Sequence, residues 1–337
     1  MKKTTIIGNY LRKGFLAYLE SESEHQRKNG HISVANNYRS AANSFARFLQ
    51  AQKKKDVSFK KLTPLMIADY EAWLQMGGLC KNTTSFYIRA LQAVYNRAVR
   101  QGLTEDHKPF VGVYRGVAKT VKRAIAPKEV CQLKALDIRA ELVKKGYSGK
   151  RLRNLQHQLD FARDIFIFSF CARGLTFVDL AHMRKSNISG GSLAYVRRKT
   201  KQRIEVQMES QMQEVIDRHP SLTDYLFPIL TKTGNKEAVY HQYRYALARY
   251  NASLEILGEM LGGLKLTSYV SRHSWASAAH QQHVPLSIIS QSMGHDSEKT
   301  TEIYLKSLEC NVINKSNHEL LANVFRISAN NSEIPYF

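Results

Sequence analysis

Residues 266–308 read LTSYVSRHSWASAAHQQHVPLSIISQSMGHDSEKTTEIYLKSL, and this stretch decides how the second half of the chain folds. The spacing of its apolar residues predicts three short helices, over residues 269–280, 286–293 and 297–308. Arg272 lies at the start of the first helix, Gly294-His295 ends the second, and Tyr304 follows that histidine by nine positions. We therefore expect the three helices to bring Arg272, His295 and Tyr304 together.

These residue types suit chemistry on a phosphodiester. A phenol, with an unperturbed pKa of about 10, is a poor nucleophile at neutral pH, so Tyr304 needs a base or strongly positive surroundings. The Arg272 guanidinium would bind the nonbridging oxygens of the phosphate. His295 would hydrogen-bond such an oxygen or assist removal of the Tyr304 proton. Taken singly, the same residues also fit ordinary roles: a half-buried tyrosine, a surface ion pair and a helix C-terminal cap.

Upstream of this stretch the pattern is mixed. Residues 193–208 alternate apolar and polar side chains around Lys199-Thr200-Lys201-Gln202, which predicts a basic β-hairpin with Lys199 in its turn. A lysine at the tip of a hairpin can reach into a groove of a bound partner. Helices are expected from Pro127 and over residues 159–170, 177–183 and 242–261. The fold class is therefore mainly α with a small β-sheet (α+β).

The amino-terminal third predicts a four-helix unit. Apolar residues recur at helical spacing over residues 34–49, 63–77 and 82–102, with a weaker helix over residues 10–19. Thr63-Pro64 is a typical helix start, and Gly102 a typical helix end. Residues 103–125 lack sustained periodicity, so we expect an interdomain linker that lies against phosphates.

The charge points to a polyanionic partner. The 337 residues contain 50 Lys+Arg and 28 Asp+Glu, a net charge of +22, and residues 1–125 alone hold 22 basic and 8 acidic residues. Lysine and arginine on phosphates release counterions, so nucleic acid is the leading candidate partner. The candidate DNA contacts are Lys53, Lys54, Lys55, Lys81, Arg89, Lys119, Lys122, Arg123 and Lys201.

Several classes of protein are excluded. A hydrophobic fraction of 43% is too high for wholesale disorder, and no run approaches the roughly 18 apolar residues of a membrane span. The start of the chain lacks signal-peptide features, so we expect a soluble, cytoplasmic protein. The four cysteines form no CxxC pair, and no Gly-rich phosphate loop, HExxH or GxSxG occurs. We expect neither a metal nor another cofactor.

At these residues the sequence resembles the tyrosine recombinases, the phage integrase family. The last boxes of that family read roughly HxLRHxxA, then LGH, then a tyrosine nine residues on. Here they stand as Tyr269-Val270-Ser271-Arg272-His273-Ser274-Trp275-Ala276, Met293-Gly294-His295 and Tyr304. Residues 172–180, ARGLTFVDL, stand where the first arginine box falls, and Arg197-Arg198-Lys199-Thr200 where the hairpin lysine falls. The four-helix unit is similar to the core-site-binding domain of the family.

Two positions depart from the family pattern. Tyr269 replaces the usual histidine before the second arginine; it cannot act as an imidazole base but can donate an O–H bond to phosphate. Thr176 stands where the first arginine is expected. Arg173, one helical turn earlier, is the favoured substitute, and Arg197, expected on the same strand face as Lys199, is the alternative.

The resemblance implies a site-specific recombinase that works through a 3′-phosphotyrosyl intermediate and a Holliday junction. It implies double-stranded DNA at core sites, self-association to a tetramer, accessory DNA-bending proteins and an origin in a mobile element. The implied division is a core-site DNA-binding domain (1–106), a basic linker (107–125), a catalytic domain (126–312) and a tail helix exchanged between protomers (313–337). The alternatives are a noncatalytic DNA-binding or architectural protein with a decayed site, and a type IB topoisomerase-like enzyme.

Overall fold

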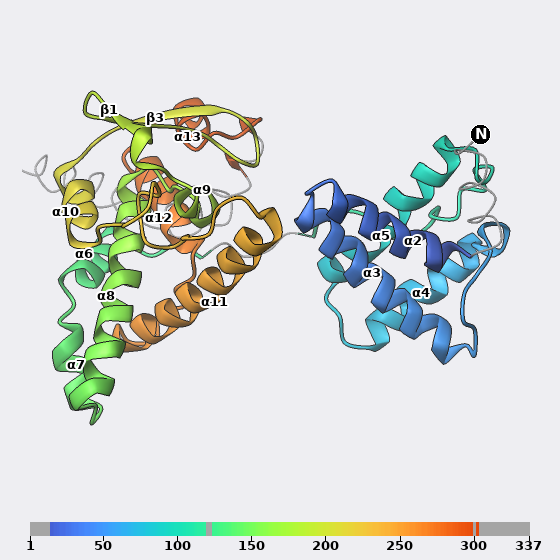
Figure 1. Ribbon diagram of the computed structural model, residues 1–337, viewed down its shortest axis with the longest axis horizontal. Helices are drawn as coiled ribbons and strands as arrows, with labels where there is room; N and C mark the ends of the chain where they lie inside the picture. Colours follow the sequence, from blue (N-terminus) through green and yellow to red (C-terminus); the bar gives the residue numbers. More distant parts are fainter. Residues whose placement is uncertain (1–13, 119–122, 299–300, 303–337) are drawn as a thin grey trace, which may run out of the picture. The chain divides into compact units, whose positions relative to one another are not determined.

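The computed structural model describes residues 14–118, 123–298 and 301–302, and the chain divides into two compact units, Met1–Thr120 and Val121–Phe337 (Figure 1). The division falls inside the segment predicted as a linker. Each unit has its own apolar core. The predicted class, mainly α with a small β-sheet, is confirmed.

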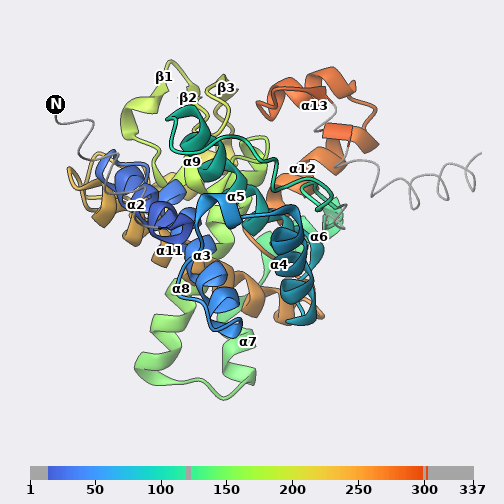
Figure 2. The ribbon, with the colours of Figure 1, turned by 90° about the vertical axis from the view of Figure 1, so that its right-hand side faces the viewer.

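The first unit contains the predicted four helices. They are α2 (Phe15–Lys28), α3 (Ile32–Ala51), α4 (Pro64–Met76) and α5 (Lys81–Arg100), with a short 3-10 turn, η1 (Phe59–Lys61), before α4. Helix α2 lies along α3, and both contact α5 (Figures 1 and 2). The first helix runs well beyond the predicted residues 10–19, because its polar second half carries no apolar repeat that the sequence could reveal.

Aromatic rings fill the core of this unit. Phe45 meets Phe15 and Tyr70 edge to face, with ring centroids 6.0 and 5.2 Å apart. The buried Tyr70 hydroxyl donates to Ser44 Oγ at 2.8 Å, so its polar end is satisfied. Helices α2, α3 and α4 are thereby fixed by one cluster of side chains.

Helix α4 begins at the predicted residue, whereas α5 begins earlier than predicted. Thr63 caps α4 by accepting from the Met66 amide at 3.3 Å, as expected. Helix α5 begins after Cys80 rather than in the predicted cap region at residues 82–84. Asn82 is therefore inside the helix. Its side-chain oxygen accepts from the Ala118 amide at 2.7 Å, and its side-chain nitrogen donates to the Ala118 carbonyl at 3.0 Å.

The first part of the predicted linker belongs to the first unit. Phe110 and Val113 are buried in its core, and the Tyr114 amide donates to Glu71 at 3.1 Å. Isolated apolar residues such as these give no periodic signal, so the sequence did not show that this segment is packed.

The second unit is built around one long helix, α8 (Gly149–Cys171), seen near the middle of that unit in Figure 1. Among the described helices it packs mainly against α6 (Pro127–Ala135), α7 (Ile138–Lys144), α10 (Ser210–Arg218), α11 (Lys236–Met260) and α12 (Val270–Gln281). Both α8 and α11 start earlier than predicted, at Gly149 and Lys236. The first turns of α8 are largely exposed and polar, which hides the helical period there.

A three-stranded antiparallel sheet covers one end of this unit, in the order β1 (Ile188–Ser189), β2 (Ser192–Val196) and β3 (Arg203–Gln207). Leu193 pairs with Val206 and Tyr195 with Ile204, and all four side chains are buried. The predicted hairpin and its inward face are therefore confirmed. The described part of the unit also contains the short helices η2 (Lys185–Asn187), α9 (Phe177–Ala181) and α13 (Leu286–Ser292).

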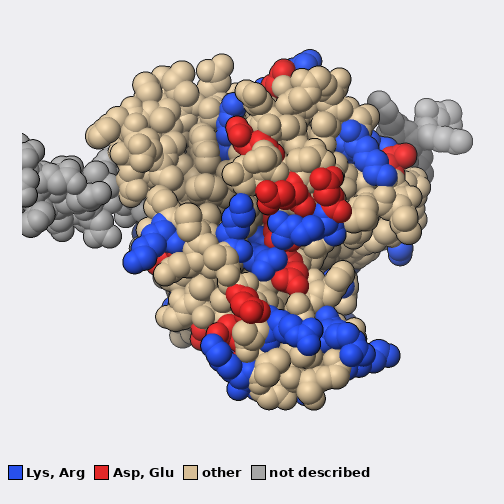
Figure 3. Space-filling model, turned by 90° about the vertical axis from the view of Figure 1, so that its left-hand side faces the viewer, with Lys and Arg blue, Asp and Glu red and all other residues tan. Residues whose placement is uncertain are grey.

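Figure 3 shows a face of the second unit on which Lys and Arg side chains gather over α7 and the first turns of α8. The exposed basic residues of these elements and of the turn between them are Arg139, Lys144, Lys145, Lys150, Arg151 and Arg153. No helix within the described ranges combines the length and apolar character that a membrane span requires.

Asp56 caps α2 from a distance of 40 residues in sequence. Its carboxylate accepts from the Leu16 and Ala17 amides at 2.8 and 3.1 Å, because Gly14 at the helix start has no side chain to do so. We expect Asp56→Ala to lower the free energy of unfolding of the first unit by about 1–2 kcal/mol in urea denaturation. Asp69→Ala, on the exposed face of α4, is the control; equal losses in both variants would contradict the capping role.

Candidate active site

Arg272 lies in the first turn of α12 and is almost fully buried, with 2% of its surface exposed. Its NH1 donates to the Gly174 carbonyl at 2.7 Å, and its NH2 donates to the Met293 carbonyl at 2.6 Å. The same NH2 lies 3.0 Å from Nε2 of His295. One guanidinium therefore ties α12 to the turn after α8 and to the end of α13.

His295 follows the end of α13. Gly294, at φ +62°, and His295 close this helix: their amides donate to the Gln291 and Ser290 carbonyls at 2.9 and 3.0 Å. The Gly-His pair predicted to end a helix does so, and the helix end places the imidazole against Arg272.

The bond to Arg272 fixes the protonation of His295. A guanidinium has donors only, so Nε2 must accept and the proton of the neutral ring is on Nδ1. Nδ1 then donates to Thr301 Oγ1 at 2.7 Å. Burial lowers the pKa of His295 to about 3, and the charges of Arg272, Arg197 and Lys199 act in the same direction. His295 is therefore neutral at physiological pH.

Two glycines allow these close approaches. Gly174 has φ +72°, and a Cβ there would stand 2.7 Å from Cα of Arg272. A Cβ on Gly294 would stand 2.7 Å from Cδ1 of Ile204 and 3.2 Å from Cδ of Arg197. Both positions need a glycine, because the backbone is left-handed there and because a Cβ would clash with its neighbours.

The turn between β2 and β3 is bonded to the Gly-His pair. Arg197 NH1 and Thr200 Oγ1, the latter at 2.9 Å, both donate to the Gly294 carbonyl, and Gln202 donates to the His295 carbonyl at 3.0 Å. Lys199 is exposed in this turn, close enough for its charge to depress the pKa of His295. The hairpin thus brings Lys199 beside the cluster of Arg272 and His295.

The expectation that Arg197 and Lys199 share a strand face is wrong. Strand β2 ends at Val196, so the two residues lie in the turn, where the alternation of a strand no longer applies. Arg197 is 4% exposed and donates to the protein backbone, whereas Lys199 is exposed.

Arg173 lies in the turn after α8 with φ +57°, a conformation that costs a residue with a side chain about 1 kcal/mol. Its charge acts on the buried Tyr195 hydroxyl, as do those of Arg272 and Arg197. Burial raises the Tyr195 pKa, and the Asp179 carboxylate raises it further, while the three guanidinium groups oppose them. The charges of three arginines therefore act on the same buried tyrosine.

Thr176 does not take the place of a guanidinium. Its buried hydroxyl donates to Asp179 Oδ2 at 2.7 Å, and Asp179 Oδ1 accepts from the Arg198 amide at 2.8 Å. Thr176 and Asp179 together hold the start of α9 against the β2–β3 turn.

Comparisons with known proteins identify the family and the fold. A model described as the phage integrase SAM-like domain matches residues 14–114, and one described as the phage integrase family matches residues 150–310. The chain belongs to the phage integrase family, the tyrosine recombinases. No curated protein sequence gives a significant match.

Solved structures of recombinases share the fold. A Tn1549 transposon integrase in complex with a circular intermediate DNA has a TM-score of 0.59 at 11% identity, over 89% of this chain and 99% of that one. A lambda integrase tetramer bound to a Holliday junction has 0.56 at 15% identity, over 86% and 76%. A XerH recombinase bound to a palindromic difH substrate, in a post-cleavage complex, has 0.54 at 15% identity, over 93% and 95%.

The remaining predicted residues of this integrase-family chain fall in several places. Tyr269 precedes α12 beside the turn that carries Arg272, with 46% of its surface exposed. Lys53, Lys54 and Lys55 are exposed after α3, Lys81 and Arg89 are exposed on α5, and Arg123 and Lys201 are exposed in the second unit. Tyr304, Lys119, Lys122 and the tail 313–337 lie outside the described residues. The predicted roles of all these residues stay predictions.

Sequence reasoning did not assign a role to Asp179 or Thr301. Asp179 stands within the quoted ARGLTFVDL segment, and its position after a helix-starting threonine was the available signal. Thr301 stands three residues before Tyr304, a spacing that puts two residues on one face of a helix.

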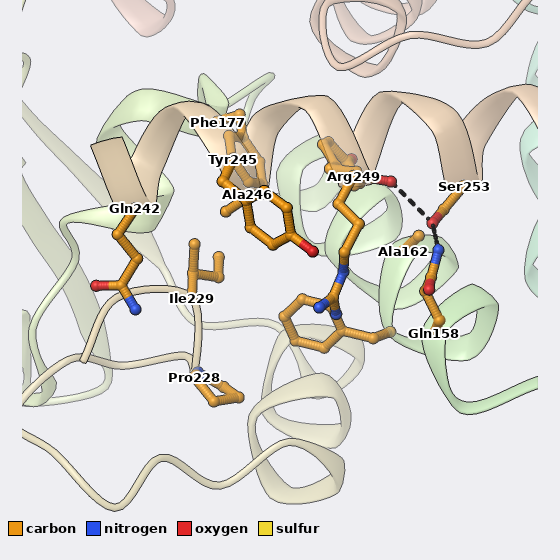
Figure 4. A pocket seen from close by; sticks show the side chains of 12 residues that line it. Gln158, Ala162, Phe177, Pro228, Ile229, Gln242, Tyr245, Ala246, Arg249 and Ser253 are labelled. Atoms are coloured by element: carbon orange, nitrogen blue, oxygen red, sulfur yellow. Dashed lines mark hydrogen bonds between the residues drawn. The ribbon is translucent and has the colours of Figure 1, made fainter. Parts of the chain in front are cut away.

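A separate cavity of about 200 Å³ lies between α8, α11 and the segment at residues 228–229 (Figure 4). Tyr245 and Arg249 of α11 line it with Phe161, Phe177 and Ile229. None of the predicted site residues lines this cavity.

We expect Gly174→Ala to lower the free energy of unfolding of the second unit by about 2–4 kcal/mol, through a left-handed alanine and a clash with Arg272. Gly190→Ala is the control, because it has φ +56° but nothing within 4 Å, and we expect a loss of about 1 kcal/mol. Denaturant unfolding measures both. Equal losses would show that the contact with Arg272 contributes nothing.

The depressed pKa of His295 makes stability depend on pH. In the unfolded chain a histidine titrates at about 6.5, so between that pH and about 3 the unfolded state binds one more proton than the folded state. The contribution of neutral His295 to the free energy of unfolding is therefore complete above about pH 6.5, and it is lost as the pH falls towards 3. We expect His295→Gln to flatten this part of the stability curve in chemical denaturation, and an unchanged slope would contradict a neutral His295.

Proposed function

We propose that this chain is a site-specific DNA recombinase that cuts and rejoins DNA through a 3′-phosphotyrosyl intermediate on Tyr304 and a Holliday junction. Membership of the phage integrase family supports DNA strand exchange as the general activity. The observation that carries the proposal is the set of bonds that gathers the arginines: Arg272 and Arg197 donate to the adjacent Met293 and Gly294 carbonyls, and Arg272 also donates to Gly174, the residue after Arg173. The charge of Lys199 acts on His295 in the same cluster.

The charge balance of this cluster favours an anion as its occupant. Asp179 is a carboxylate whose charge acts on Tyr195 alongside the three arginines, and its oxygens already accept from Thr176 and the Arg198 amide. A concentration of guanidinium groups in a largely buried place is stabilised by an anion that accepts several N–H bonds. The nonbridging oxygens of a phosphodiester supply such acceptors, and their charge grows in the transition state.

In the proposed reaction the Tyr304 oxygen attacks phosphorus, the bond from phosphorus to the 5′ oxygen breaks, and the DNA 3′ phosphate becomes linked to the tyrosine. Lys199 supplies the proton that the departing 5′ oxygen needs, and its exposed place in the β2–β3 turn leaves it accessible to DNA. Attack by a 5′-hydroxyl of the partner strand reverses the link. The energy of the phosphodiester is conserved, so no nucleotide is required.

Two roles were predicted for His295: a hydrogen bond to a nonbridging phosphate oxygen, or removal of the Tyr304 proton. The hydrogen bonds of its ring favour neither role. Nε2 accepts from Arg272, so it has no proton to give a phosphate oxygen, and a ring with a pKa of about 3 is a weak base at neutral pH. We assign His295 to orienting Arg272. The Tyr304 proton is then taken up by water.

We assign the first arginine position to Arg173 rather than Arg197. Arg197 is buried with NH1 on the Gly294 carbonyl, a structural bond that closes the turn onto α13. Arg173 is only partly buried, and the strain of its backbone is the kind that proteins retain at functional sites. Tyr269, exposed before α12, is assigned to donate its hydroxyl to the same phosphate.

The proposed substrate is double-stranded DNA at specific core sites, gripped by the exposed lysines and arginines at the end of α3 and on α5. The lambda integrase structure above is a tetramer on a Holliday junction, which supports assembly of this chain into a tetramer on DNA. In this proposal residues 313–337 are exchanged between protomers, accessory proteins bend the DNA, and the chain serves a mobile element in the cytoplasm.

Tyr304→Phe separates this function from a noncatalytic DNA-binding protein, the alternative that Thr176 and Tyr269 suggest. We expect the variant to form no covalent adduct with a nicked suicide duplex while its DNA affinity stays within a few fold of the original, since one hydroxyl is a minor part of a large phosphate interface. Tyr245→Phe, an exposed tyrosine of α11, is the control and should form adduct normally. Adduct formation by Tyr304→Phe would refute the assignment.

A further inference from the structure

Helix α7 and the start of α8 carry a concentration of positive charge that none of the roles above uses. Residues 139–153 contain six basic residues and one acidic residue. All six basic side chains are exposed, and Figure 3 shows Lys and Arg side chains gathered over these elements. We call this surface the α8 basic face, and its residues are Arg139, Lys144, Lys145, Lys150, Arg151 and Arg153.

Most of this charge has no carboxylate partner. Lys144 pairs with Glu141 at 2.6 Å, but the other five basic residues of the face form no ion pair within the part of the chain that the structure describes. Further along the same helix, Arg163 pairs with Asp160 at 3.1 Å and with Asp164 at 3.0 Å. Helix α8 therefore neutralises a cation in its middle and leaves those at its start available to a partner.

The place of these cations is unfavourable for the helix alone. The first turn of α8 follows Ser148 and contains Lys150 and Arg151 but no acidic residue. The N-terminus of a helix carries a partial positive charge, so carboxylates are favoured there and cations are disfavoured. Lys150 and Arg151 therefore do not serve the stability of α8, and an anion bound between them and the helix end would offset the repulsion.

A shallow groove lies beside the same turn. Its lining includes Tyr147, Lys150, Arg151 and Asn154, together with Ile256 of α11. The Arg151 guanidinium lies over the Tyr147 ring, with Cζ 5.0 Å from the ring centroid. Such stacking holds the planar group in one orientation and leaves its N–H edge for hydrogen bonds. The groove thus offers an anion two cations and, on Asn154, an amide donor.

The α8 basic face and the proposed catalytic cluster lie at opposite ends of α8. The helix has 23 residues, which span about 34 Å, and Arg173 lies in the turn after it. In Figure 1, α7 and the first turns of α8 lie at the lower end of the second unit, and the β-sheet lies at the upper end. An anion on the face is therefore a different phosphate from the one in the cluster.

The composition of the face favours a DNA backbone over an acidic protein as its partner. Val143 is the exposed large apolar side chain of residues 139–153, whereas protein interfaces usually bury an apolar centre. Lysine and arginine bind phosphates without reading the bases. DNA is also the polyanion of the proposed reaction, and because it continues beyond the cut its local concentration at the protein is high.

We propose that the α8 basic face is a second DNA-binding surface, which holds the phosphate backbone of duplex DNA outside the core site and does not read its sequence. The inference rests on the proposed function for the presence of DNA in the complex. The face binds through counterion release and through the groove at the start of α8, so its affinity for DNA falls steeply with salt.

The first test measures binding of a second duplex. The full-length protein is saturated with a short duplex that carries only the core site, and a fluorescent duplex of unrelated sequence is then titrated. We expect Lys150→Glu/Arg151→Glu to weaken binding of the unrelated duplex by about tenfold and to reduce the slope of log affinity against log salt by about 2, because two phosphate contacts are lost. Acidic residues suit the first turn of a helix, so we expect this variant to unfold at a higher urea concentration than the original protein.

Lys128→Glu/Lys134→Glu is the matched control. It makes the same change of charge at two exposed positions of α6, near the other end of α8, where the Lys134 charge acts on the Cys171 thiol. We expect it to bind the unrelated duplex like the original protein. Equal weakening in the two double variants would indicate a general effect of net charge and overturn the inference, as would unchanged binding in Lys150→Glu/Arg151→Glu.

The second test needs no substitution. Acetylation of exposed lysines, followed by mass spectrometry, reports which side chains a bound molecule covers. With the unrelated duplex at about ten times its Kd, we expect Lys145 and Lys150 to react about tenfold more slowly and Lys134 to react at its original rate. Undiminished reaction of Lys145 and Lys150 would overturn the inference. Protection by a polyglutamate peptide but not by the duplex would also overturn it, and would assign the face to an acidic protein.

These outcomes are separate from those that test the proposed function. The acetylation experiment requires neither strand cleavage nor a core site. If the original protein forms no covalent adduct, the proposed function fails, and protection of Lys145 and Lys150 by the unrelated duplex still decides whether the α8 basic face binds DNA.

Discussion

The buried guanidinium of Arg272 is the interaction on which the second unit depends. Removing a charge from water costs several kcal/mol unless its donors are satisfied. Here the acceptors are the carbonyls of Gly174 and Met293 and the Nε2 atom of His295, contributed by two segments that are far apart in the chain. The charge therefore stays buried only if the turn after α8 and the end of α13 are both in place.

The local conformations around this guanidinium follow from that requirement. Gly174 leaves room for the Arg272 backbone, and Ser169 on α8 holds the same turn by accepting the Gly174 and Leu175 amides at 2.9 and 3.1 Å and bonding Ser271 at 2.7 Å. On the other side, the β2–β3 turn closes onto Gly294 through Arg197. A positively charged cluster is thus held in place by backbone turns, and such a cluster stabilises an anion bound against it.

The sequence predicted those features that depend on local pattern. The alternation of Leu193 and Tyr195 with Ile204 and Val206 indicated the hairpin, and the Gly294-His295 pair indicated a helix end; both are present. It could not show that Arg197 is buried, because this depends on where β2 ends. Nor could it show the tautomer of His295, which is set by partners 23 residues before and 6 after it. Such contacts between elements leave no periodic trace.

The central claim is that this cluster serves a phosphodiester attacked by Tyr304, and mapping the covalent product tests it most directly. The full-length protein is incubated with a nicked suicide duplex that carries its recombination site, the DNA and protein are digested, and the linked peptide is sequenced by mass spectrometry. The account predicts a nucleotide joined through its 3′ phosphate to Tyr304. A link to another residue, a link through a 5′ phosphate, or no link on a duplex that the protein binds specifically would contradict it.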